Sequence, residues 1–126
     1  MVAGLQLCCP DKSIPTPPEV TEWRERMLYH ELVSSLNYIM VATHPDIAYA
    51  VGQLASFLDC FLHDHWTTAV HILHYLKATK TLSLVLGGTH APSLLGYSDA
   101  DFANCKNTSW SISGYCYSLG SGIISW

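Results

Sequence analysis

The final third of the chain is built from three short runs of β-branched and aromatic residues with turn-forming residues between them. The runs cover residues 94–97, 112–119 and 123–126. Gly120-Ser121-Gly122 separates the last two. Runs of this length and composition are typical of strands, and a short glycine-containing link between two of them is typical of a hairpin turn. We therefore expect a short antiparallel sheet at this end of the chain.

The middle of the chain shows a helical period instead. Between residues 23 and 79, apolar residues recur at spacings of three and four, which predicts amphipathic helices. Pro45 suits the first position of a helix, and the negative charge of Asp46 is favoured in a first turn. Three such helices joined by short links would bury their apolar faces against each other. The three stripes are Leu28, Leu32, Leu36, Ile39 and Met40; Ile47, Val51, Leu54, Ala55 and Leu58; and Trp66, Ala69, Val70, Leu73 and Leu76.

These patterns predict an α+β chain with a three-helix bundle from about residue 27 to 79, followed by a short antiparallel sheet. Residues 1–22 are rich in proline, which cannot sustain a helix interior or a central strand, so we interpret them as a tail or linker. Residues 23–80 form the helical segment and residues 81–126 the sheet segment. Within the latter, the apolar run of residues 82–86 predicts one further strand.

The charge balance argues against strong nucleic-acid binding by this chain alone. The 126 residues hold six Lys and Arg against ten Asp and Glu, and no basic run occurs. The five cysteines show no regular spacing typical of a disulfide framework. The apolar stretch of residues 32–58 is interrupted at residues 43–46, which leaves pieces shorter than the ~20 residues of a membrane span. We expect no membrane association and an intracellular location, cytoplasmic or nuclear.

Two long stretches resemble the Pol polyproteins of copia-type (Ty/copia) retrotransposons. The C-terminal stretch reads LLGYSDADFANCKNTSWSISGYCYSLGSGIISW. It resembles the GYSDADWA…GY.F.L..G.ISW run that opens the ribonuclease H domain of that family. The earlier stretch resembles the segment after the polymerase palm, which looks like the thumb of the reverse transcriptase. That resemblance is carried by Tyr29, Leu32-Val33, Leu36, Tyr38, residues 43–48, His65-Trp66 and Tyr75-Leu76-Lys77.

The resemblance implies a role for Asp99 in holding magnesium. In the family, the aspartate at this place is the first of several carboxylates that hold the catalytic Mg²⁺ of ribonuclease H. Asp101 is a second candidate ligand because alternate residues of a strand project to the same face, although its place in the family is not catalytic. Magnesium needs several oxygen ligands, and the other family carboxylates have no counterpart in the 126 residues. We therefore expect no catalysis by this chain alone.

The resemblance also implies the partners of the intact polyprotein. The helices would help to hold an RNA–DNA hybrid, together with the remaining polymerase and ribonuclease H domains. Several positions depart from the family pattern where it usually carries arginine, and these losses of positive charge indicate a catalytically inactive relic. The departures are His44, Ser56, His71, His74 and Trp110.

Two other functions are compatible with the residues. The exposed edges of a short sheet are templates for another chain, so the alternative to a relic is a protein–protein interaction module, including self-association through those edges. A zinc site could draw on Cys60, His63 and His65, or on His71 and His74, but these positions lack the ordered ligand pairs that tetrahedral zinc normally uses. Surface or half-buried histidines are the simpler interpretation.

Overall fold

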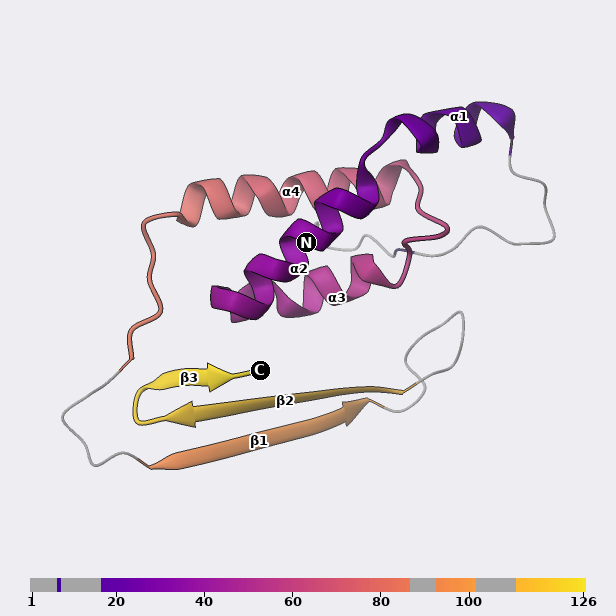
Figure 1. The fold of residues 1–126 in the computed structure, drawn as a ribbon. Helices are drawn as coiled ribbons and strands as arrows, with labels where there is room; N and C mark the ends of the chain where they lie inside the picture. Colours follow the sequence, from indigo (N-terminus) through magenta and orange to yellow (C-terminus); the bar gives the residue numbers. More distant parts are fainter. Residues whose placement is uncertain (1–6, 8–16, 87–92, 102–110) are drawn as a thin grey trace. The chain divides into compact units, whose positions relative to one another are not determined.

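The computed structural model describes residue 7 and residues 17–86, 93–101 and 111–126. The chain divides into two compact units, Met1–Lys80 and Thr81–Trp126. The described part of the first unit is helical, and that of the second holds a three-stranded antiparallel sheet (Figure 1). The predicted α+β class is therefore confirmed. Within the described residues, no helix is both long and apolar enough to cross a membrane.

The helical unit contains four α-helices and one short 3₁₀ turn in its described part. They are α1 (Pro18–Arg26), α2 (Tyr29–Thr43), η1 (Pro45–Ile47), α3 (Ala48–Ala55) and α4 (His63–Thr79). Pro45 begins the 3₁₀ turn, as its fixed φ angle favours, and Asp46 lies in the first turn. The three helical stripes of the sequence thus correspond to α2, to η1 with α3, and to α4.

Helix α1 corrects the prediction that residues 1–22 form a tail or linker throughout. It begins at Pro18, at the first helical position, where a missing N–H costs nothing. Glu19 lies in its first turn and Arg24 and Arg26 in its last, which complements the helix dipole. A proline in this position therefore starts a helix, whereas the prediction treated every proline of the tail as a helix breaker.

The core of the helical unit lies where α2, α3 and α4 meet. Tyr29 is completely buried, its hydroxyl donates to the carbonyl of Leu54 at 3.0 Å, and its ring stacks on Phe61 with centroids 4.3 Å apart. The core residues are Tyr29, Val33, Leu36, Ile47, Val51, Leu54, Phe61, Ala69 and Ile72. The predicted first and second stripes supply four of these nine residues, but the prediction missed Tyr29 and Val33 of α2, and Leu28 precedes α2 and is exposed.

The predicted stripe of α4 is wrong by one residue. His65, Thr68, Ala69 and Ile72 are buried, whereas Leu73 is 40% exposed. The buried set follows the spacing of three and four that begins at His65. The buried Thr68 is satisfied locally, since its hydroxyl donates to the Asp64 carbonyl at 2.7 Å. A search for apolar residues alone therefore aligned the stripe on Trp66 and Leu73.

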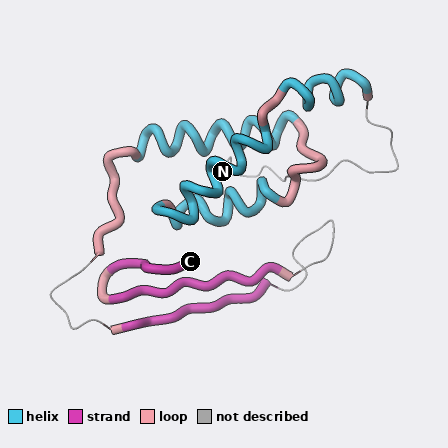
Figure 2. The backbone as a smooth tube through the Cα atoms, viewed as in Figure 1, coloured by secondary structure: helices cyan, strands magenta, loops and turns pink. Residues whose placement is uncertain are grey.

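The sheet unit is a meander of three antiparallel strands (Figure 2). They are β1 (Leu94–Asp101), β2 (Ile112–Leu119) and β3 (Gly122–Ser125), with β2 in the middle. Gly120 in the β2–β3 turn has a φ angle of 62°, the left-handed conformation that glycine adopts at little cost. The predicted hairpin is confirmed, and the predicted first strand continues past residue 97 to Asp101.

The predicted strand at residues 82–86 is absent, because this segment has no regular secondary structure. It contacts β3 in another way. A Cβ atom added to Gly122 would overlap the Leu86 side chain and lie 2.9 Å from the Val85 carbonyl oxygen. Leu86 thus occupies the space that a side chain at position 122 would need, so an apolar run that looks like a strand packs against the sheet without pairing with it.

Replacing Gly122 with alanine should destabilise the sheet unit by ~1–3 kcal/mol, because the backbone oxygen of Val85 cannot move aside cheaply. Gly114→Ala is the matched control, since a Cβ atom there meets nothing within 4 Å. Urea unfolding of the full chain, followed by the circular dichroism of the sheet, measures both. Equal midpoints for the two variants would contradict the close packing at Gly122.

Candidate carboxylate site and its relatives

Asp99 lies on β1, directly opposite Gly114 of β2. Gly114 has no side chain, and a Cβ atom built there meets nothing within 4 Å, so the sheet surface beside the Asp99 carboxylate is open. The Asp99 Oδ1 atom accepts a hydrogen bond from the backbone N–H of Ala100 at 2.9 Å. A shallow hollow of about 480 Å³ surrounds this position, lined by Ser98, Asp99, Ala100, Ser113, Gly114 and Tyr115.

Asp101 follows two residues later on the same strand and is paired with Ile112. The two carboxylates therefore project from one face of β1, as the strand period predicts. Both are exposed and carry oxygen atoms, the ligands that magnesium prefers. Within the described residues, however, no group of three or more His, Cys, Asp and Glu side chains is placed to hold a metal ion. The described part of the sheet can thus supply a portion of a magnesium site.

The tyrosines of β2 lie on the opposite face of the sheet from Asp99. Tyr117 is paired with Gly96 and Tyr115 with Ser98, which places their side chains on the alternate face. The Tyr117 ring covers Gly96 so closely that an added Cβ atom would lie 2.6 Å from its Cε1 atom. The Tyr115 and Tyr117 rings contact each other with centroids 5.9 Å apart. These aromatic rings pack on the sheet and are separate from the carboxylates.

The histidines and cysteine considered for zinc are used differently in the helical unit. The Nδ1 atom of His65 accepts the backbone N–H of Leu62 at 2.9 Å, and Cys60 is disulfide-bonded rather than a thiolate. The His63 ring packs against the Trp23 indole with centroids 5.5 Å apart. His71 and His74 are exposed on α4. None of these described residues belongs to a three-ligand cluster.

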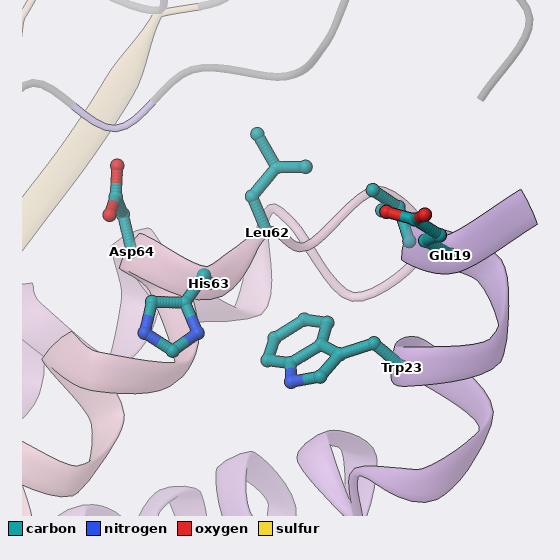
Figure 3. Close-up of a pocket in the computed structure, with 6 residues that line it drawn as sticks. Glu19, Trp23, Leu62, His63 and Asp64 are labelled. Carbon is teal, nitrogen blue, oxygen red and sulfur yellow. The ribbon is translucent and has the colours of Figure 1, made fainter. Parts of the chain in front are cut away.

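A second hollow, of about 380 Å³, lies between α1 and the start of α4. Figure 3 shows Trp23 extending from α1 toward His63 of α4, with the Glu19 and Asp64 carboxylates at the sides. Nearby, the Arg24 Nε atom donates to the Phe61 carbonyl at 2.7 Å, and the guanidinium carbon lies 5.8 Å from the centre of the Phe61 ring. The sequence pattern did not single out Trp23 or Arg24, because contacts between segments far apart in the chain carry no local signal.

Comparison with known proteins places the chain among transposon sequences. No protein-family model matches it, and no solved structure is significantly similar. It is 40% identical over 115 residues to the retrovirus-related Pol polyprotein from transposon TNT 1-94 of Nicotiana tabacum. This alignment covers 91% of this chain and 9% of that protein. It is 36% identical over 109 residues to the corresponding polyprotein from transposon RE2 of Arabidopsis thaliana, covering 86% of this chain and 7% of that protein.

A protein much shorter than the polyproteins is also similar to most of this chain. The chain is 39% identical over 98 residues to Secreted RxLR effector protein 161 of Plasmopara viticola, which covers 78% of this chain and 69% of that protein. The chain therefore spans less than a tenth of the length of the Pol polyproteins it matches, but most of this effector. By these similarities, the chain is homologous to a segment of the retrovirus-related Pol polyproteins from copia-type plant transposons.

Proposed function

We propose that the chain corresponds to the end of the reverse transcriptase and the start of the ribonuclease H domain of a copia-type Pol polyprotein. The helical unit would belong to the thumb or connection of the polymerase, and the sheet unit would be the first strands of a ribonuclease H-like fold. The observation that carries this proposal is Asp99, an exposed carboxylate on β1 beside the bare backbone of Gly114. The family resemblance implies a catalytic carboxylate at this position, which supports the proposal.

In the intact polyprotein, Asp99 would be one ligand of catalytic magnesium. Magnesium held there would supply the activation of a water and the stabilisation of the leaving oxygen when RNA is hydrolysed in an RNA–DNA hybrid. The role of this chain is to hold the Asp99 carboxylate at a fixed place. The strand backbone and the hydrogen bond from the Ala100 N–H to Oδ1 orient it, which leaves Oδ2 free of that bond. The remaining carboxylates would come from the rest of the polyprotein, so this chain alone is inactive.

The test replaces the aligned segment of the TNT 1-94 polyprotein with this chain and measures magnesium-dependent cleavage of RNA in an RNA–DNA hybrid. Asp99→Asn keeps the size of the side chain but removes its charge. We expect a loss of at least about a hundredfold in rate, because metal ligation is worth several kcal/mol of barrier lowering.

Asp101→Asn is the matched control, since it removes a carboxylate from the same face of the same strand. We expect the cleavage rate of this variant to stay within about tenfold of that of the unsubstituted chimera. This corresponds to a change of about 1.4 kcal/mol or less in the activation barrier. Equal losses in both variants would assign no special role to Asp99. A larger loss in Asp101→Asn would transfer the proposed role to that residue.

A second function is favoured by the exposure of the sheet. All eight residues of β1 are exposed, and β1 lies at an edge of the described sheet. An edge strand of this kind can pair with another chain, so the alternative is an interaction module that also self-associates. Sedimentation of the full chain would show dimers that dissociate when Ser98→Pro removes a backbone donor that faces away from β2, at the open edge of β1. A monomer at all concentrations would exclude self-association.

A further inference from the structure

His65 lies buried at the start of α4, and its hydrogen bond selects one tautomer of the neutral ring. The side chain is 1% exposed, and its Nδ1 atom accepts the backbone N–H of Leu62 at 2.9 Å. A nitrogen that accepts an N–H carries no hydrogen itself, so the proton of the neutral ring resides on Nε2. That Nε2 atom is buried and has no hydrogen-bond partner. The geometry therefore specifies a neutral imidazole with a single hydrogen bond.

This hydrogen bond closes the first turn of α4. The Leu62 carbonyl accepts the backbone N–H groups of His65 at 3.1 Å and of Trp66 at 3.2 Å, while the Leu62 N–H is bound by the His65 ring. Leu62 and His65 thus satisfy each other's backbone in the manner of a helix cap. The preceding residue, Phe61, carries the contacts of α1, because Arg24 donates to its carbonyl and Trp23 packs on its ring.

A proton added at Nδ1 would break this closure. It would place a second donor against the Leu62 N–H and a positive charge in a site that is only 1% exposed, where burial disfavours the charged form. Two charged groups act on the imidazole: Asp64 on its own helix favours the charged form, and Arg24 of α1 disfavours it. Burial is the largest influence and lowers the pKa of His65 below its usual 6.5, followed in size by the opposing influence of Asp64.

We propose that His65 is an acid-sensitive switch: its neutral ring holds the first turn of α4 closed, and its protonation opens that turn and loosens the attachment of α1. The stabilisation is fully present above about pH 6.5, the pKa of histidine in an open turn. It is lost as the pH falls below that value toward the lowered pKa of the closed form. Over this range the ratio of open to closed turns rises by up to about tenfold per pH unit.

The test is hydrogen exchange of single backbone amides in the full chain between pH 7.5 and 5, corrected for the intrinsic effect of pH. Below about pH 6.5, protection of the Leu62 amide should fall by up to about tenfold per pH unit, whereas protection of the Ile72 amide should stay constant. Ile72 is buried in the middle of the same helix. A parallel loss at both amides would mean unfolding of the whole unit and would overturn the proposal.

Two variants separate His65 from the other histidines. His65→Asn keeps an acceptor for the Leu62 N–H but does not titrate, so the pH dependence of the Leu62 amide should disappear. His71→Asn changes an exposed histidine of the same helix and should leave the pH dependence of the Leu62 amide unchanged. Persistence of the pH dependence in His65→Asn would contradict the proposal.

A measurement on the unsubstituted chain covers the case in which His65→Asn does not fold. Nitrogen NMR of the imidazoles should show His65 as the tautomer protonated on Nε2, with a pKa below 6.5. A proton on Nδ1 at neutral pH, or titration at or above 6.5, would overturn the proposal.

Discussion

Truncating Tyr29 to alanine should lower the free energy of unfolding of the helical unit by ~3–5 kcal/mol, the usual cost of removing a large buried aromatic ring. Tyr29 is completely buried and stacks on Phe61, with an angle of 13° between the rings. It also links the start of α2 to the end of α3, because its hydroxyl donates to the Leu54 carbonyl. Urea unfolding of the full chain, followed by helical circular dichroism, measures the loss.

Tyr29→Phe separates the two contributions of this residue. It keeps the ring and removes one of the two donors of the Leu54 carbonyl, which still accepts the Phe57 N–H, so it should cost ~0.5–1.5 kcal/mol, the net contribution of one hydrogen bond. The alanine variant should therefore be clearly less stable than the phenylalanine variant. If the two variants unfolded at the same urea concentration, the stacking on Phe61 would contribute nothing, and the described core would be wrong.

Leu36→Ala should be the second large effect, at ~2–5 kcal/mol, because it removes a fully buried side chain and leaves a cavity. Leu36 lies in the middle of α2, away from the helix ends, so little rearrangement can fill the space. The measurement is the same urea titration of the full chain.

Val41→Ala is the control for Leu36→Ala, since Val41 lies on the same helix but is 64% exposed. A substitution at such a surface position should change stability by no more than ~0.5 kcal/mol. A large effect at Val41, or a negligible one at Leu36, would show that the buried face of α2 had been assigned to the wrong side of the helix.

The helical period found the buried residues of α3, which are apolar, but only Leu36 among the three buried residues of α2. Leu36, Val51 and Leu54 follow the predicted spacing and are fully buried. The same rule failed on α4, where buried His65 and Thr68 interrupt the apolar pattern. The His65 Nδ1 atom and the Thr68 hydroxyl bond to neighbouring backbone groups, which makes burial tolerable, and a scale of hydrophobicity contains no information about those bonds.

What the sequence could not predict about the strands has a similar origin. The alternation and the turn glycines predicted β2, β3 and their hairpin, and the period of two placed Asp99 and Asp101 on one face. The register that sets Asp99 opposite Gly114 depends on pairing between distant segments, which no local pattern specifies. Whether an apolar run pairs or merely packs is also decided by its neighbours. Leu86 fits over Gly122, so the run of residues 82–86 packs on the sheet without forming a strand of it.

The most direct test of the proposed function compares hydrolysis of an RNA–DNA hybrid by this chain alone and by the chimeric polyprotein that contains it. Asp99 is one carboxylate of a set, and within the described residues no three-ligand metal cluster exists. We predict magnesium-dependent cleavage by the chimera and none by the isolated chain. Magnesium-dependent cleavage by the isolated chain that Asp99→Asn abolishes would contradict the claim that the site needs carboxylates from the rest of the polyprotein. A folded chimera that leaves the hybrid intact would contradict the claim that Asp99 of this segment still serves a working ribonuclease H site.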